Sequence, residues 1–140
     1  MYGLTKKAAG KKITELLYRF SIDYADKRFD SYSTGMKRKM SLVRALLNNP
    51  RILLIDELTQ SLDYETAGDI SSYIRKLADD KVTVIISDHN INVLEKLCRF
   101  FIFLKKGHML AFDNIDNLRN RLEDPDADLT EIYELIKKNV

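Results

Sequence analysis

The sequence predicts an α/β fold with parallel strands, and three features of its pattern lead to this prediction. Two short apolar runs, 52–55 and 82–86, contain mainly leucine, isoleucine and valine, which is typical of strands in a parallel sheet. A segment with helical spacing of its apolar residues, 63–78, separates the two runs. The chain has 140 residues and is 45% hydrophobic, so it can bury a compact core. We therefore expect strand, helix and strand to alternate, with the strands parallel.

The N-terminal third of the chain is expected to be helical. Thr5 can cap a helix that ends near Phe20, and after a polar connector, 23–32, Ser33 can cap a second helix to about Leu47. Both helices are amphipathic. The apolar face of the first consists of Ile13, Leu16, Leu17 and Phe20. The core stripe of the second consists of Met36, Met40, Val43 and Leu47. The residues expected on its solvated side are Lys37, Arg38, Ser41 and Arg44.

The middle and C-terminal parts alternate between strands and helices. Asn48, Asn49 and Pro50 end the second helix, and the run 52–55 then reads as a strand covered on both faces. Asp63 can cap the next helix, which leads to a second buried strand. The later elements are a helix at 90–97, a strand at 100–104, a turn at 106–107, a strand at 108–112, and helices at 114–122 and 128–138.

Composition and charge argue against several classes of protein. Twenty-three basic and 21 acidic residues leave a formal net charge of +2, so no polycationic surface is present and no nucleic-acid partner is expected. Cys98 is the single cysteine, which excludes an internal disulfide and favours a small core residue over a nucleophile. No apolar run approaches the roughly 20 residues needed to span a bilayer. The N-terminus has no signal-peptide pattern.

Two segments of the sequence contain residues that can bind a phosphate or take part in a reaction at one. Ser33 and Gly35 open a helix, where free backbone N–H groups and the positive end of the helix dipole favour a phosphate. Asp56 and Glu57 end the first strand, where carboxylates can hold Mg²⁺ and orient a water for attack on phosphorus. Taken by itself, the acidic pair also reads as a solvated turn, because most Asp and Glu side chains are exposed.

Four short motifs follow one another along the chain: Tyr-Ser-Thr-Gly-Met at 32–36, a strand ending in two acidic residues at 51–57, Ser-Leu-Asp at 61–63 and Ser-Asp-His at 87–89. Together they resemble the nucleotide-binding domain of ABC transporters, and the segment 32–36 resembles the signature motif of that family. The segment 51–57 resembles its Walker B strand with the catalytic glutamate, and 61–63, Ser-Leu-Asp, resembles its D-loop. The segment 87–89, Ser-Asp-His, matches the switch histidine. The combined order and spacing make the resemblance specific, and it covers nearly all of the chain but only the later part of a family domain.

The resemblance implies roles for individual residues. It implies that Asp56 holds Mg²⁺ through water, that Glu57 activates the attacking water, and that His89 contacts the γ-phosphate. It also implies that ATP bound to a second nucleotide-binding subunit contacts this chain through its signature and D-loop. The residues of that contact are Ser33, Thr34, Gly35, Met36 and Asp63. The expected cofactors are ATP and Mg²⁺, and the expected setting is the cytoplasmic side of a membrane, on a permease subunit.

The sequence departs from the family pattern in two ways: residues within the motifs are substituted, and two motifs are absent. Thr34 replaces a signature glycine, and a β-branched side chain there hinders the closest approach of a phosphate. Met36 replaces the usual glutamine, and Leu58 stands where proline usually follows the glutamate, which removes a fixed φ from that turn. No Gly-x-x-x-x-Gly-Lys-Ser/Thr phosphate loop (Walker A) and no glutamine loop occur in the sequence.

We therefore interpret the chain as one partial P-loop NTPase domain of ABC type. Its expected parts are a helical signature region (1–48), an α/β core with Walker B, D-loop and switch histidine (49–113), and C-terminal helices (114–140), with a hairpin before those helices. A partner carrying the N-terminal half with Walker A is expected, and the chain alone is expected to be inactive. Two alternatives remain open at this point: the C-terminal half of a DNA-repair or chromosome-maintenance head ATPase, and a degenerate, non-catalytic interaction protein.

Overall fold

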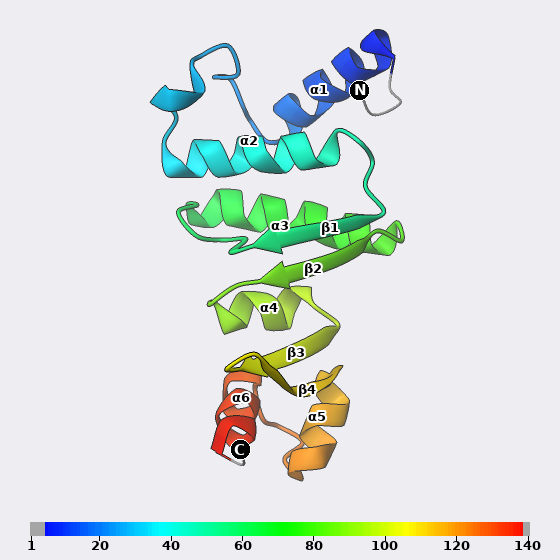
Figure 1. Ribbon diagram of the computed structural model, residues 1–140, viewed down its shortest axis with the longest axis vertical. Helices are drawn as coiled ribbons and strands as arrows, with labels where there is room; N and C mark the ends of the chain where they lie inside the picture. Colours follow the sequence, from blue (N-terminus) through cyan, green and yellow to red (C-terminus); the bar gives the residue numbers. More distant parts are fainter. Residues whose placement is uncertain (1–4, 139–140) are drawn as a thin grey trace. The chain divides into compact units, whose positions relative to one another are not determined.

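The computed structural model describes residues 5–138, which form two compact units (Figure 1). The first unit is Met1–Ser87 and the second is Asp88–Val140, and each is described by itself. Both units combine helices with a two-stranded sheet, which confirms the α/β class. Between residues 5 and 138, no helix has the length and apolar character required to cross a membrane.

The helices of the first unit begin where the sequence predicts, because each is capped by the expected side chain. Thr5, Ser33 and Asp63 are the N-caps, and the side-chain oxygen of each accepts a hydrogen bond from the backbone N–H three residues later. These bonds satisfy N–H groups that have no partner inside the helix. The helices are α1 (Lys6–Arg19), the 3₁₀ turn η1 (Phe29–Ser31), α2 (Thr34–Leu46) and α3 (Tyr64–Asp79).

The sheet of the first unit consists of two parallel strands, β1 (Ile52–Asp56) and β2 (Thr83–Ser87). The strands pair in register from Ile52 opposite Thr83 to Asp56 opposite Ser87. Because the strands are parallel, their carboxyl ends meet at one edge of the sheet. The predicted parallel pairing is thus confirmed, and it brings the polar residues at both strand ends together.

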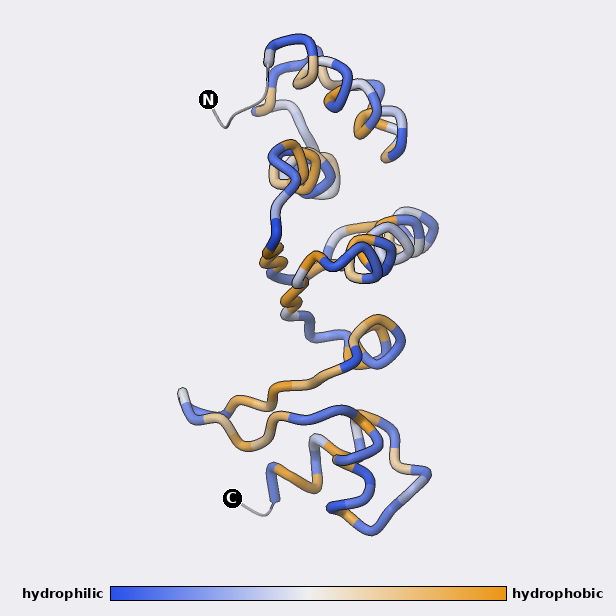
Figure 2. The backbone as a smooth tube through the Cα atoms, turned by 90° about the vertical axis from the view of Figure 1, so that its right-hand side faces the viewer, coloured by the Kyte–Doolittle hydropathy of each residue, from blue (hydrophilic) through white to orange (hydrophobic). Residues whose placement is uncertain are grey.

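The prediction that both strands are buried on both faces is wrong. Leu53 is 4% exposed, but its neighbours on the opposite face, Ile52 and Leu54, are 62% and 72% exposed, and Ile85 of β2 is 52% exposed. Side chains alternate between the faces of a strand, so these exposed residues share one face. In Figure 2, α3 lies on one side of the two strands. Among the described residues, the other face has no covering helix, and its apolar residues therefore meet solvent.

The core of the first unit lies where its helices meet. One residue of α1, the Phe20 that follows it, and two residues each from α2 and α3 are buried. Phe20 and Tyr73 make an edge-to-face ring contact at 5.2 Å between centroids. This contact joins the end of α1 to α3. The buried residues of the three helices and their ends are Leu16, Phe20, Val43, Leu46, Ile70 and Ile74.

The second unit packs a hairpin against helices. Strands β3 (Phe100–Lys105) and β4 (His108–Asn114) pair antiparallel, and Gly107 takes φ 80° in the turn between them. Its helices are α4 (Ile91–Leu97), α5 (Ile115–Leu122) and α6 (Leu129–Lys138). Its buried core consists of Phe101, Phe103, Leu118, Ala127, Leu129 and Ile132. Cys98 packs against this core, as expected for a small apolar residue, and burial raises the pKa of its thiol.

Several non-glycine residues adopt the left-handed conformation at the ends of elements. Ser21, Lys81 and Glu123 do so just after α1, α3 and α5, where they end the helices. Glu57 and Ser61 do so in the loop that follows β1, with φ of 54° and 62°. The left-handed region is costly for a residue with a side chain, so this loop is held by contacts elsewhere.

Candidate functional site

The first part of the site is the N-terminal end of α2. Ser33 has an extended backbone and accepts a hydrogen bond on its Oγ from the backbone N–H of Met36, at 3.2 Å. Ser33 and Thr34 are exposed, whereas Gly35 and Met36 are half-buried. Thr34 is the first helical residue and is not among the left-handed residues, so its β-branched side chain meets no backbone strain there. Contact of these four residues with a nucleotide stays a prediction.

An aromatic support lies beneath this helix end. Tyr32 is 6% exposed, its hydroxyl donates to the backbone carbonyl of Tyr24 at 2.9 Å, and the two rings pack edge to face at 5.0 Å. The hydroxyl of Tyr24 in turn donates to the carbonyl of Met36 at 3.5 Å. The connector before α2, expected to be polar with scattered aromatic residues, therefore packs its aromatic residues against the start of α2.

Gly35 lies against the loop after β1. A Cβ atom on Gly35 would stand 2.7 Å from the backbone oxygen of Ser61 and 3.7 Å from a methyl group of Leu62. The first of these distances is shorter than real Cβ contacts allow, so only glycine fits without a backbone shift. The signature segment and the D-loop segment, separated in sequence, are thus in direct contact.

The second part of the site is the carboxyl end of β1. Asp56 pairs in register with Ser87 of β2, and the Ser87 hydroxyl donates a hydrogen bond to Asp56 Oδ1. The backbone N–H of Glu57 donates to the Ser87 carbonyl at 2.7 Å. Ser87 thus fixes both acidic residues. Sequence reasoning included Ser87 in the Ser-Asp-His motif at 87–89 but gave its side chain no role, although the pairing of two parallel strands at their polar ends was a signal that could have found it.

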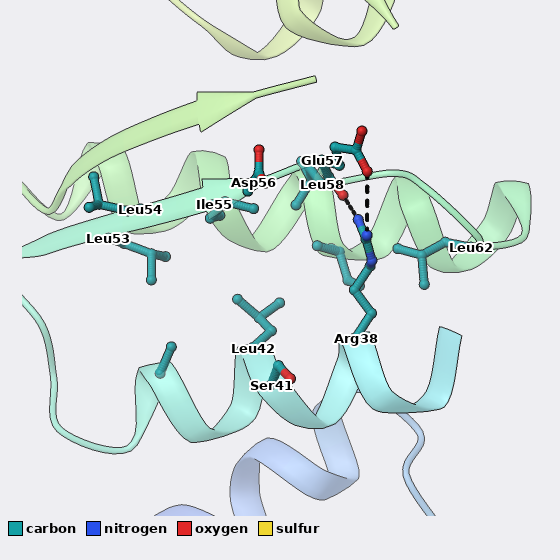
Figure 3. Close-up of a pocket in the computed structure, with 12 residues that line it drawn as sticks. Arg38, Ser41, Leu42, Leu53, Leu54, Ile55, Asp56, Glu57, Leu58 and Leu62 are labelled. Atoms are coloured by element: carbon teal, nitrogen blue, oxygen red, sulfur yellow. Dashed lines mark hydrogen bonds and ion pairs between the residues drawn. The ribbon is translucent and has the colours of Figure 1, made fainter. Parts of the chain in front are cut away.

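Arg38 connects the two parts. Its guanidinium group donates to the backbone carbonyl of Glu57 and lies 3.7 Å from Oε2 of the same residue (Figure 3). It also donates, at 2.7 Å, to Oε1 of Gln60. The Arg38 side chain is 27% exposed and that of Glu57 is 40% exposed. The expectation that Arg38 lies on a solvated basic face is therefore wrong. A contact across 19 residues of sequence leaves no local signal, so helical spacing alone could not reveal it.

Leu58 anchors the loop that carries Glu57. Its side chain is 4% exposed, so it is a core residue. Packing of this side chain therefore holds the turn where the family usually has proline. A cavity of about 170 Å³ lies between α2 and β1, beside Arg38, Glu57 and Leu58 (Figure 3). Ligand pockets are usually about 300 Å³ or larger, so this cavity does not enclose a nucleotide.

The described residues fit one kind of magnesium site. Within residues 5–138, no group of three or more His, Cys, Asp or Glu side chains could hold a metal ion. Asp56 offers one exposed carboxylate, hydrogen-bonded to Ser87. Mg²⁺ in nucleotide sites commonly takes one or two carboxylates and completes its shell with waters and phosphate oxygens. Asp56 therefore fits a magnesium ion held jointly with a nucleotide, and does not fit an all-protein cage.

Asp63 caps α3. Its Oδ1 accepts a hydrogen bond from the Thr66 backbone N–H at 2.9 Å, and this bond is the main reason that the pKa of Asp63 lies below its ordinary value. The residue is exposed on the loop that touches Gly35. Its predicted contact with a second subunit stays a prediction.

His89 belongs to the second unit. Its side chain is 69% exposed, and Nδ1 lies 3.7 Å from Oδ1 of Asp88, whose carboxylate also accepts the Asn90 backbone N–H at 2.8 Å. His89 follows β2 by two residues, as expected for a switch histidine. Its contact with a γ-phosphate stays a prediction. His108 is exposed at the start of β4, within the strand predicted at 108–112.

Comparison with known proteins identifies the family. The family model described as "ABC transporter" matches residues 4–60. Bacillus subtilis NatA, an ABC transporter ATP-binding protein, is 29% identical over 84% of this chain and 48% of its own length. The Escherichia coli arginine transport ATP-binding protein ArtP is 33% identical over 77% of this chain and 45% of its own.

Solved structures agree with these relatives. An ATP-binding subunit of an ABC transporter superimposes with a TM-score of 0.90 at 26% identity, over 97% of this chain and 57% of that one. An ATP-binding cassette solved as a dimer with ADP and Pi gives a TM-score of 0.72 at 28% identity, over 81% and 50%. The chain spans about half the length of the curated relatives that it matches. With the Gly35 contact and the strand-end carboxylates in place, the chain belongs to the ATP-binding proteins of ABC transporters and forms part of their nucleotide-binding domain.

Proposed function

We propose that this chain supplies one half of an ATP-hydrolysing site in an ABC transporter, together with the signature segment that completes a site on a second subunit. One observation carries the proposal. A single unit holds the exposed end of α2 and the Asp56–Glu57 end of β1 in fixed relation, through the Gly35–Ser61 contact and the bonds from Arg38. Such fixed positioning is what phosphoryl transfer to water requires.

The two strand-end carboxylates have different surroundings and so suit different roles. Asp56 accepts a hydrogen bond from Ser87 and would hold Mg²⁺ through water, where the ion would neutralise charge on the phosphates of ATP. Glu57 is half-exposed, and its backbone is held at both ends by Ser87 and Arg38. Its carboxylate would accept a proton from the attacking water. His89 would contact the γ-phosphate.

The end of α2 serves the partner subunit. The Ser33 hydroxyl and the N–H groups near Gly35 would donate to the γ-phosphate of ATP held by a second nucleotide-binding subunit. Asp63, exposed beside the same contact, would join the two sites across the dimer. The dimeric cassette that this chain resembles supports such an arrangement.

The relatives support a proposal for the wider assembly. We infer a permease subunit as the membrane partner and a cytoplasmic position against it, with ATP hydrolysis powering transport. The phosphate loop would come from the N-terminal half of such a domain. NatA and ArtP are ATP-binding proteins of transporters, which disfavours both a chromosome-maintenance ATPase and a degenerate interaction protein.

The test is ATP-dependent association. The chain is mixed with a hydrolysis-deficient full-length NatA, with and without ATP, and the bound fraction is measured by pull-down. ATP should increase binding, and Ser33→Ala should weaken the ATP-dependent part by about tenfold or more, because one hydrogen bond to a charged group is worth roughly 2 kcal/mol. Ser72→Ala, an exposed serine of α3, is the matched control and should bind as the parent does. Binding that is equal with and without ATP contradicts the proposal.

A further inference from the structure

Three consecutive basic residues of α2 extend in different directions. The ammonium group of Lys37 lies over the ring of Phe29, 5.8 Å from its centroid. Lys39 donates a hydrogen bond to the backbone carbonyl of Phe20 at 3.4 Å. Arg38 lies between them in sequence and extends to the loop that follows β1 (Figure 3). Successive side chains of a helix are about 100° apart around its axis, so the place of Arg38 on α2 sets this direction.

Arg38 makes two kinds of contact with Glu57. Its guanidinium group donates a hydrogen bond to the backbone carbonyl, whereas the carboxylate lies 3.7 Å away, farther than a hydrogen bond reaches. The guanidinium group also donates to Oε1 of Gln60 at 2.7 Å, so it bridges the two residues. Arg38 therefore fixes the backbone at position 57 and leaves the carboxylate, whose side chain is 40% exposed, able to turn.

The loop that Arg38 holds has a strained backbone. Glu57 and Ser61 adopt the left-handed conformation, with φ of 54° and 62°, which costs free energy for residues with a side chain. Such a conformation persists where surrounding contacts determine it. Two of those contacts come from α2, through Arg38 at one end of the loop and through Gly35 against the Ser61 carbonyl at the other. The first turn of α2 and the conformation of Glu57 are therefore mechanically connected.

Arg38 is also close to the end of α2 that, in the proposed function, binds the nucleotide of the partner subunit. It lies five residues after Ser33 and three after Gly35, about one turn along the helix. A phosphate bound to the N–H groups of the first turn would order this end of α2, because each hydrogen bond restricts the group that donates it. Ordering that extends to Arg38 would narrow the range of positions open to Glu57.

We propose that Arg38 is the positioning residue that links occupancy of the partner's nucleotide site to the orientation of Glu57. With nucleotide bound at the first turn of α2, Arg38 would hold the loop 57–61 still and aim the Glu57 carboxylate at the attacking water. Without that nucleotide, the loop would move and the carboxylate would lose its aim. One site of the dimer would thus prepare the other for hydrolysis. This inference rests on the proposed function and adds to it how the two sites are coupled.

The experiment measures amide hydrogen exchange in the full chain. The chain is saturated with hydrolysis-deficient full-length NatA in the presence of ATP, as judged by pull-down, and the reference sample contains the same proteins without ATP. Exchange is followed at 57–59, in peptic fragments that end before 61, because 61–63 is expected to contact the partner itself. In the parent chain, ATP should slow exchange at 57–59 roughly fivefold or more, which is the lower end of typical coupling between two sites.

Substitutions at Arg38 test whether this residue carries the effect. Arg38→Met should abolish the slowing, because the aliphatic stem remains but the donors to Glu57 and Gln60 are gone. Arg38→Lys keeps the charge without the planar fork that reaches both acceptors, so it should retain only part of the effect. Arg44→Met, at an exposed position of the same helix, is the matched control and should keep all of it. A merely structural role of Arg38 would speed exchange equally with and without ATP, and the ratio of the two rates would not change.

The possible results distinguish two failures. If ATP promotes association with NatA but exchange at 57–59 is unchanged, or is slowed equally in Arg38→Met, the coupling is overturned and the proposed function stands. If the parent chain shows no ATP-dependent association, both are overturned. Circular dichroism verifies that each variant folds. Should Arg38→Met unfold, Arg38→Lys decides the question, since it keeps both the stem and the charge, and a full ATP effect in that variant would overturn the coupling.

Discussion

The backbone oxygen of Ser61 lies 2.7 Å from the point where a Cβ atom on Gly35 would stand. The glycine is thus required by protein packing, in addition to any contact that it makes with phosphate. This relationship couples the first turn of α2 to the loop before Asp63. The two segments cannot move closer together at this point, because no free space is left between them.

Gly35→Ala should therefore destabilise the chain. The added methyl group meets a backbone oxygen, which cannot rotate away, and overpacking of this kind costs about 1–3 kcal/mol. Urea unfolding followed by circular dichroism measures the change. Gly68→Ala is the control, because Gly68 lies within α3 and a Cβ there would meet nothing within 4 Å. That variant should gain about 0.5–1 kcal/mol from helix propensity. Equal effects at the two glycines would contradict the packing account.

Arg38→Met should destabilise the first unit by about 1–2 kcal/mol, because it removes charge-assisted hydrogen bonds to Glu57 and Gln60 while it keeps much of the aliphatic stem. The same unfolding experiment measures it. Arg44→Met, an exposed position on the same helix, is the matched control and should change stability by less than about 0.5 kcal/mol. If both substitutions cost the same, Arg38 behaves as the solvated residue that helical spacing suggested.

Because Asp63 caps α3 through its carboxylate, the stability of the fold should decrease at acidic pH. The hydrogen bond from the Thr66 N–H lowers the pKa of Asp63 below its ordinary value of 3.8. A carboxyl group with a lowered pKa stabilises the fold fully above its ordinary pKa, and this contribution is lost as the pH falls through the lowered value.

The measurement for Asp63 compares variants across pH. Asp63→Ala should be less stable than the parent at pH 7, and the difference should shrink below about pH 4, the ordinary range of aspartate. Thr5→Ala removes the hydroxyl cap of α1, and its effect should not vary over the same range because the hydroxyl does not titrate. A pH-independent difference for Asp63→Ala would show that the charge of the cap is unimportant.

Cys98 should react slowly with thiol reagents in the folded chain. Burial raises the pKa of its thiol, so less of the reactive thiolate is present at pH 8, and contact with the core of the second unit restricts access. Reaction with a disulfide reagent should be much faster in urea than in buffer, with a single thiol released per chain. Equal rates in the two conditions would mean that the site is open in the native state.

The chain alone should not turn over ATP. Glu57 and Asp56 are in place, but the sequence contains no Gly-x-x-x-x-Gly-Lys-Ser/Thr loop to cradle the β- and γ-phosphates. Phosphate release from purified chain should stay at background. Turnover by the chain alone that disappears in Glu57→Gln would contradict this expectation, because it would show that the residues present suffice for catalysis.

Local features of the fold could be predicted from the sequence, and contacts between distant residues could not. The three caps Thr5, Ser33 and Asp63 each satisfy a backbone group within one turn, so their signal lies within four residues of sequence. The order of motifs likewise located Asp56 and Glu57 at a strand end. The second face of β1 and β2 was predicted incorrectly, because an apolar residue in a strand shows what the strand can bury and not whether a covering layer is present.

The site residues that were not predicted also make their contacts with residues far away in the sequence. Arg38 reaches Glu57 across 19 positions, and Ser87 reaches Asp56 across 31, and neither separation has a characteristic pattern. Gly35 was singled out for its place at a helix end that suits a phosphate, and in the structure the group that approaches it is the Ser61 carbonyl. Tertiary contact, not sequence spacing, decides which polar side chains surround the carboxylates.

The left-handed residues at the ends of α3 and α5 are positions where substitution should make the protein more stable and easier to produce. Lys81 and Glu123 hold φ of 67° and 55°, are exposed, and lie outside the candidate site. Glycine adopts this conformation without steric cost, so Lys81→Gly and Glu123→Gly should raise the melting temperature and the yield of soluble protein. Glu57 and Ser61 share the conformation, but replacing Glu57 would remove the carboxylate itself. Engineering for crystallisation can therefore relax the helix ends while it leaves the strained loop untouched.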